Sequence, residues 1–109
     1  MANTFKLKTK ANVGVTTVEI YTAPAATTTV VIGITMANTS GSGVNVGVGI
    51  TRAGATEDVK LLKNAPIPQG SSLEFMGGNK VVLETNDQIN VDSDTNNSVD
   101  AALTIMEIT

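Results

Sequence analysis

The chain has 109 residues and a formal net charge of −3, which fits one small acidic domain. It contains no Cys, His or Trp, so a disulfide framework and the common Cys/His zinc sites are excluded. Its 7 basic residues suggest no broad nucleic-acid footprint, and no apolar run approaches the ~20 residues of a membrane helix. The start, MANTFKLKTKA, lacks the apolar block of a secretory signal. We therefore expect a soluble protein that is made in a cell's cytoplasm, with neither nucleic acid nor membrane as partner.

Thr, Val, Asn and Gly are abundant in this chain, whereas Leu and Glu are scarce for a helical protein. β-branched residues lose rotamer freedom in helices and fit the pleated surface of a sheet. The composition therefore predicts an all-β domain.

The stretch TFKLKTK near the N-terminus alternates with a period of two. Phe5 and Leu7 point to one side, and Lys6, Lys8 and Lys10 point to the other. This pattern predicts a short strand or an extended arm. Two interpretations stay open: an arm that lies on another subunit, or an edge strand on which lysines prevent unwanted pairing.

The next predicted strands are residues 18–22 (VEIYT) and 27–38 (TTTVVIGITMAN). The chain turns between them, because Pro24 cannot donate to a ladder. The second strand is apolar on both faces, which suggests that it is covered on both sides or lies against another subunit. Strict alternation puts four apolar residues of this strand on one face: Val30, Ile32, Ile34 and Met36.

Residues 44–52 (VNVGVGITR) form the next predicted strand, after a hairpin loop at TSGSG. Its valines make the inward face, and Gly47 and Gly49 share the other. Two glycines on one face make a low patch that another chain can approach closely. The alternative is a bulge or a strongly twisted surface strand.

Residues 59–65 are predicted to be a strand, followed by an extended sheet-edge passage where two prolines bracket Ile67. Residues 67–91 contain three short alternating segments, which predict a meander with a tight hairpin at Gly77-Gly78-Asn79. The last strand, residues 99–109, either finishes the fold or adds to a neighbour's sheet. It carries Ala102, Thr104, Met106 and Ile108 on one face.

Together these segments give about eight strands with short connections and no convincing helical periodicity. They predict one β-sandwich, jelly-roll or immunoglobulin-like, with a small barrel as the other architecture that buries one face of each strand. We expect residues 1–12 to form an N-terminal arm or edge strand and residues 13–109 to form the β-sandwich domain.

Catalytic groups are scarce. Ser71 and Ser72 have no imidazole to activate them, because the chain has no His. Glu74 and Glu84 could lie near each other across the predicted hairpin, but two solvated charges on a sheet face are the expected explanation. We expect no enzyme, no catalytic residue and no cofactor.

The segment Asp92–Asn96 has the oxygen spacing that opens a calcium loop. The pattern then fails, because Asn97 stands where such a loop needs Gly and Leu103 stands where it needs Glu. An ordinary Asp/Asn turn is the expectation, so no metal site is predicted, although the sequence leaves open a weak calcium site here.

Several blocks resemble small virion structural proteins of tailed bacteriophages: MANTFKLKTKANVG, TTTVVIGITMANTS, LLKNAPIPQGSSLEF, NKVVLETNDQINV and NNSVDAALTIMEIT. The resemblance covers nearly the whole chain, in overall pattern and without a diagnostic motif. It implies a non-enzymatic virion protein, such as a capsid decoration (cement) protein that stabilises the outer capsid surface. A tail, neck or fibre-base component is the alternative.

The resemblance also implies the major capsid protein or tail proteins as partners, a homo-oligomer (a trimer is favoured) and a place in the virion after synthesis in the host's cytoplasm. A carbohydrate-binding module is a third possibility, although only three aromatic residues are present. The patterns of the residues themselves predict the following subunit interface: Phe5, Lys6, Leu7, Lys8, Lys10, Gly47, Gly49, Met106 and Ile108.

Overall fold

The computed structural model describes residues 2–53, 58–75 and 80–109, and this part of the chain folds into nine β-strands. None of the described residues belongs to a helix long and apolar enough to cross a membrane. The strands are β1 (Asn3–Val13), β2 (Val18–Thr22), β3 (Thr28–Asn38), β4 (Val44–Thr51), β5 (Asp58–Ile67), β6 (Ser72–Phe75), β7 (Val81–Leu83), β8 (Gln88–Ser93) and β9 (Val99–Ile108).

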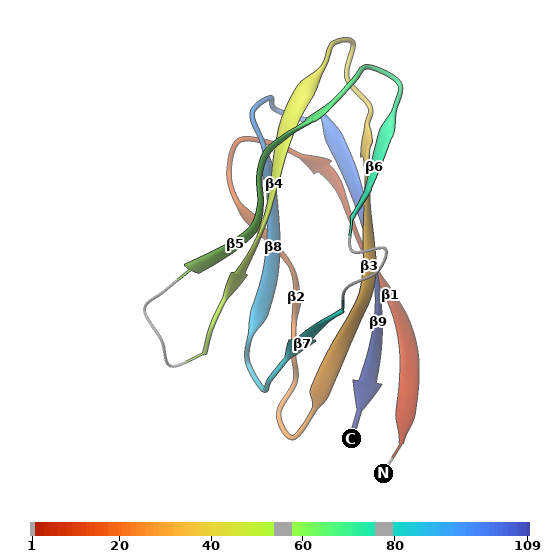
Figure 1. Cartoon of the computed structure of the whole chain (residues 1–109), viewed down its shortest axis with the longest axis vertical. Helices are drawn as coiled ribbons and strands as arrows, with labels where there is room; N and C mark the ends of the chain where they lie inside the picture. The colour runs from red at the N-terminus through yellow and green to blue at the C-terminus, as the bar shows by residue number, and fades with distance from the viewer. Residues whose placement is uncertain (1, 54–57, 76–79) are drawn as a thin grey trace.

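The strands form two antiparallel sheets that face each other across one core (Figure 1). One sheet has the order β1-β9-β3-β6, with β7 also paired to β3, and the other has the order β2-β8-β4-β5. Among these nine strands, six of the eight connections cross between the sheets; only the β4–β5 and β6–β7 connections stay within one sheet. This is the double Greek-key order of a jelly roll, which confirms the predicted β-sandwich and decides against the immunoglobulin-like alternative.

Period-two alternation builds the core. In β9 the residues at odd positions from Val99 to Glu107 are buried, and those at even positions are exposed or half-buried. Strand β8 buries Ile89 and Val91 in the same way. Because each strand hides one face, the sandwich fills with aliphatic side chains from both sheets. The largest fully buried residues include Val31, Ile34, Met36, Val46, Val48, Leu83, Leu103 and Ile105.

A β-bulge in β3 corrects one predicted face. Val31 pairs with Ile105 and Gly33 pairs with Thr104, so Ile32 is an extra residue in the ladder. The bulge changes the phase of the alternation, and the buried residues are therefore Val31, Ile34 and Met36. The prediction that Val30, Ile32, Ile34 and Met36 share a face is wrong because strict alternation takes no account of an inserted residue.

The predicted meander over residues 67–91 is also wrong. Strands β6 and β7 pair separately with β3, β6 along residues 34–37 and β7 along residues 29–31. Because β9 occupies the other edge of β3, β6 and β7 lie end to end along the same edge, and β8 belongs to the opposite sheet. The hairpin predicted at Gly77-Gly78-Asn79 lies outside the described residues.

The two ends of the chain lie side by side (Figure 1). Backbone hydrogen bonds join Ala2 and Thr109 in both directions, at 3.2 and 3.0 Å. Strand β9 lies between β1 and β3, so both of its edges are used and it finishes the fold. Strand β1 is at the edge of its sheet, and β5, which contains Pro66, is at the edge of the other, as the prolines predict.

Candidate interaction surface

The outward face of the β1-β9-β3 sheet carries a row of large apolar side chains. Phe5 on β1 pairs with Met106 on β9, Met106 pairs with Val30 on β3, and Val30 pairs with Val82 on β7. Directly paired residues point to the same side of a sheet, so the row crosses four strands. Phe5 is 68% exposed and Val82 is 57% exposed, although both are fully apolar.

Three further apolar residues border this row. Leu7 is 64% exposed and pairs with Thr104, Ile108 is the last residue of β9, and Ile32 is the bulged residue of β3. None of the seven belongs to the buried core cluster. We call this set the apolar patch; it consists of Phe5, Leu7, Val30, Ile32, Val82, Met106 and Ile108.

The apolar patch contains no charged residue. Within the strands of this sheet, as far as the structure describes them, the charges that point outward are Glu74, which pairs with Thr35, and Asp100, which pairs with Ala37, both toward the other end of the strands. Asp100 accepts a hydrogen bond of 3.0 Å from the backbone N–H of Asn12. A contiguous uncharged apolar area on a sheet face is the usual mark of a protein contact surface.

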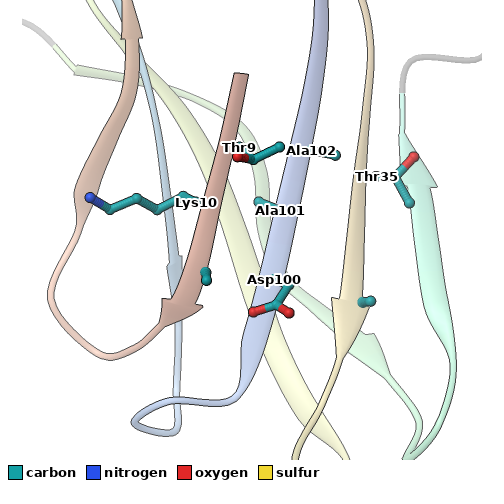
Figure 2. A pocket seen from close by; sticks show the side chains of 8 residues that line it. Thr9, Lys10, Thr35, Asp100, Ala101 and Ala102 are labelled. Carbon is teal, nitrogen blue, oxygen red and sulfur yellow. The ribbon is translucent and has the colours of Figure 1, made fainter. Parts of the chain in front are cut away.

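A shallow hollow lies on the same sheet face as the apolar patch, toward the Asp100 end of β9, and Figure 2 shows the side chains that line it. Its volume is about 350 Å³, and its floor is low because the residues across β1, β9 and β3 are small. In Figure 2 the Lys10 side chain extends away from Asp100 and Ala102. The residues around the hollow are Thr9, Lys10, Ala11, Thr35, Ala37, Asp100, Ala101 and Ala102.

The outward face of the other sheet is polar. Asn90 of β8 donates to the Thr51 hydroxyl at 3.1 Å, and Thr51 donates to Asp58 at 2.9 Å. Thr17 donates to Asp92 at 3.1 Å. These side chains are partnered within the chain and face water, so the two sheets of the sandwich have opposite outer surfaces.

The two glycines predicted as an interface lie on this polar face. Gly47 and Gly49 are both buried, because side chains and backbone of the chain itself lie over them. A Cβ at Gly47 would come within 2.6 Å of the Asp92 carboxylate, and one at Gly49 within 3.1 Å of the Asn90 amide. The β4–β5 ladder shifts register at this place, which fits the predicted alternative of a bulge.

The three lysines of β1 point to the inner side of the strand, opposite to Phe5 and Leu7. Lys6 Nζ lies 2.9 Å from Glu107 Oε1, and the Glu107 side chain is only 8% exposed. The Tyr21 hydroxyl donates to Glu107 Oε2 at 2.6 Å, and the Thr29 hydroxyl donates to the Tyr21 oxygen at 2.8 Å. This network joins the edge strand β1 to β2 in the opposite sheet.

The network shifts two pKa values in opposite directions. The hydrogen bond from Tyr21, followed by the one from Lys6, holds the pKa of Glu107 below its usual 4.5. Burial, together with the hydrogen bond to the Glu107 carboxylate, raises the pKa of Tyr21 to about 12. Both groups therefore keep one charge state near neutral pH, and neither is suited to exchange protons with a substrate.

A second buried carboxylate, Asp87, lies directly before β8 in the opposite sheet. It accepts backbone N–H groups of Ala53 at 2.9 Å and Glu84 at 3.0 Å, and Arg52 Nε lies 3.0 Å away. Arg52 also binds Glu84 at 2.8 Å. Burial alone would raise the pKa of Asp87, but these partners outweigh it and lower that pKa below 3.8. Glu84 is thus the ion-pair partner of Arg52. It follows the end of β7 that is distant from β6, which carries Glu74, so the structure does not bring the two glutamates together.

The predicted calcium-like segment is a turn held by its own side chains. Asp94 accepts the Asn45 N–H at 3.1 Å, and Ser98 donates to the Thr95 carbonyl at 2.6 Å. Among the residues that the structure describes, no group of three acidic side chains is placed to hold a metal ion.

The structure thus brings together four of the nine residues predicted as an interface: Phe5, Leu7, Met106 and Ile108 share the apolar patch. The lysines lie on the other side of β1, and the glycines lie on the other sheet. Sequence reasoning missed Val30, Ile32 and Val82, because the bulge and the β3–β7 pairing are not visible in the sequence. It also missed Glu107. The sequence does carry a signal for it, because Glu107 continues the alternating positions of Leu103 and Ile105, which point to the core.

Comparison with family models and with curated proteins finds no match. Solved structures do match in fold. A chain from Bacillus endospore appendages, described as disulfide-linked pili, aligns with 99% of this chain and 87% of its own length at a TM-score of 0.56 and 13% identity. A chain of infectious bursal disease virus, Gx strain, aligns with 95% of this chain at a TM-score of 0.58 and 13% identity.

A chain of the T13 particle of infectious bursal disease virus gives a TM-score of 0.56 and 13% identity over 96% of this chain. The protein spans only about a third of each viral chain, 33% and 30% of their lengths. At this identity the likeness shows the fold alone, which is a jelly roll found in a virus particle and in a bacterial pilus.

Proposed function

We propose that the protein is a non-enzymatic structural subunit of a bacteriophage virion, a capsid decoration protein that binds other chains through the apolar patch and reinforces the capsid. The contrast between the two outer faces carries this proposal. One sheet presents polar, internally partnered side chains to water, and the other presents Phe5, Leu7 and Val82, each more than half exposed. The fold shared with chains of virus and pilus structures supports it.

The distribution of reactive groups supports a role without catalysis. The chain has no His or Cys, and the two buried carboxylates Glu107 and Asp87 are engaged by Lys6, Tyr21 and Arg52. Tyr21 is buried by this pairing, so of the three aromatic residues it offers no platform for a sugar. The exposed ring of Phe5 lies in a row with Met106 and Val30, which favours contact with protein over sugar binding.

Particles that lack the chain provide the test. Purified recombinant protein is added to them, and the bound amount is measured by quantitative mass spectrometry after sedimentation. Replacing Val82 of the patch by Ser should reduce the bound amount several-fold, whereas Val59→Ser should not. Val59 is a matched control because it is also an exposed strand valine, 41% exposed on β5 of the other sheet. Equal binding of both variants, or no binding of the parent protein, contradicts the proposal.

A second candidate is a subunit of the tail or another filament. The pilus chain favours it, because that match covers 87% of the pilus chain, whereas the viral matches cover a third of theirs. This chain has no Cys, so a filament of it would be held by surface contacts and not by disulfides. The position and number of copies on the particle separate the candidates: many copies over the capsid favour decoration, and few copies at one vertex favour the tail.

A further inference from the structure

The Phe5–Met106–Val30 row of the apolar patch and the residues of the hollow lie on opposite sides of the Leu7–Thr104–Gly33 row, on one sheet face. On each of these strands, the next outward-pointing residue on one side of this row differs in size from the next outward-pointing residue on the other side. On one side lie Phe5 and Met106, and on the other lie Thr9 and Ala102. On β3 the corresponding residues are Val30 and Thr35. On β1, β9 and β3, large side chains at one end are therefore matched by small ones at the other, whereas along the β6–β7 edge Val82 is matched by Glu74.

We propose that this face binds the same face of a second copy, around a two-fold axis that crosses the strands at Thr104. This arrangement places each strand over its own counterpart, running in the opposite direction. Phe5 then lies over the partner's Thr9, and Met106 lies over the partner's Ala102. Each contact occurs twice, as an isologous interface requires, and each apolar ridge enters the other copy's hollow. The proposal rests on the proposed function, in which the apolar patch is a contact surface, and names a second copy as the chain that covers it. Patch variants would then weaken particle binding by removing the two-copy unit, whose linked sites bind with higher avidity.

Repulsion between the two Asp100 carboxylates favours this orientation over one whose two-fold axis runs parallel to the strands. When the strands are antiparallel across the interface, the two Asp100 carboxylates lie at opposite ends, separated by roughly 27 Å, which is eight residues of strand. An axis parallel to the strands would instead stack Asp100 over the partner's Ala37, and Ala37 is the cross-strand neighbour of Asp100. The two carboxylates would then lie near each other, and Phe5 would meet Val82, which leaves the hollows empty.

The size of the face is sufficient for a weak, specific dimer. Four strands about 4.8 Å apart and about eight residues long give a face on the order of 500 Å² per copy. Two copies therefore bury on the order of 1,000 Å², at the lower limit for specific association. Two sheets packed this way lie about 10 Å apart with strands within about 30° of alignment, a geometry that β-sandwiches use internally. A two-fold contact takes the place of the trimer expected from the sequence.

A charge swap at Thr104 tests the axis. Thr104 is exposed, points outward and meets its own counterpart only in the proposed arrangement. Analytical ultracentrifugation should show a concentration-dependent dimer for the parent chain. T104K alone and T104E alone should each weaken it at least about tenfold, because like charges meet at the axis, and an equimolar mixture should restore it. Asn45→Lys, exposed on the other sheet, is the control and should dimerise as the parent does.

Cysteine cross-linking tests the register, and the chain offers a clean background because it has no Cys. A mixture of the single variants Phe5→Cys and Thr9→Cys should form a mixed disulfide dimer under mild oxidation. A mixture of Phe5→Cys and Val82→Cys should form far less. The reverse preference overturns the proposed axis, and a parent chain that is monomeric at high concentration overturns the dimer.

The dimer and the proposed function fail in distinguishable ways. A parent chain that stays monomeric yet binds particles through Val82 contradicts the dimer and leaves the decoration role in place. A parent chain that dimerises with the T104K and T104E behaviour above, but ignores particles, supports the dimer and contradicts the decoration role.

Discussion

Phe5 lies directly opposite Met106 in the β1–β9 ladder, and both side chains point away from the core. An aromatic ring that is 68% exposed on a strand is costly to leave in water, because burying such a side chain is worth about 1.5–3 kcal/mol. The inner face of the same sheet is filled mainly by aliphatic residues, with Thr29, Asn38 and Glu107 as its buried polar members. The outward apolar row does not belong to this core, and this is why we propose it as a contact surface for another chain.

The hydroxyl of Tyr21 should contribute measurably to stability. Tyr21→Phe keeps the ring but leaves Glu107, whose side chain is 8% exposed, without its 2.6 Å donor. We expect a loss of about 1–3 kcal/mol in the free energy of unfolding, measured by urea denaturation, because a buried charged acceptor loses a partner. A variant as stable as the parent would show that the hydrogen bond contributes little.

Lysines 6 and 10 of β1 should differ in their effect on stability. Lys6→Met removes the 2.9 Å ion pair to Glu107, and we expect a cost of about 1 kcal/mol, kept small because the Lys6 side chain is 43% exposed. Lys10→Met is the matched control, because no ion pair to Lys10 occurs among the described residues. Equal chemical denaturation midpoints for the two variants would contradict a role for the pair in holding β1.

Stability should fall in acid. The folded-state pKa values of Glu107 and Asp87 lie below their ordinary 4.5 and 3.8. As pH falls, these two carboxylates are therefore protonated in the unfolded chain before they are protonated in the folded chain. The stabilisation that is present above about pH 4.5 is lost as pH falls through the lowered folded-state pKa values. Urea unfolding at pH 7, 4 and 3 should show this decline. Glu107→Gln with Asp87→Asn should be less stable at pH 7 and should decline less, and an unchanged slope would exclude these two groups as its source.

Gly47 and Gly43 should respond oppositely to alanine. A Cβ at Gly47 would meet Asp92 Oδ1 at 2.6 Å and the Leu62 carbonyl at 3.3 Å, so Gly47→Ala should cost about 1–3 kcal/mol. At Gly43 the described neighbour is the Ile67 carbonyl at 3.8 Å, an ordinary contact. Gly43→Ala should therefore be neutral or stabilise by up to about 1 kcal/mol. Thermal unfolding of both variants checks this, and a Gly47→Ala protein as stable as the parent would contradict the crowding at β4.

Local patterns in the sequence predicted much of the fold, because a strand alternates whatever its neighbours are. Phe5 with Leu7, and Met106 with Ile108, were assignable to common faces in this way. The missing information is non-local: Ile32 is bulged only against β9, and β6 and β7 are joined by their common partner β3. The Tyr21–Glu107 hydrogen bond joins residues 86 positions apart in the sequence, so no local pattern predicts it.

The candidate surface was predictable only in part for the same reason. The pairing of β1 with β9 unites Phe5 and Met106, which are distant in sequence, and the pairing of β7 with β3 adds Val82. The hollow requires Thr9, Ala102 and Thr35 to lie side by side on three strands. Single small residues in separate strands carry no signal until the order of the strands is known.

Cryo-electron microscopy of the assembled particle, at a resolution that shows side chains, would show directly whether the apolar patch is the contact surface. We expect density for this chain with Phe5, Met106, Val30 and Val82 covered by protein, and with the polar face of β8 and β4 turned toward solvent. A chain whose apolar row faces solvent while Asn45, Asn90 and Asp92 make the contacts would contradict it.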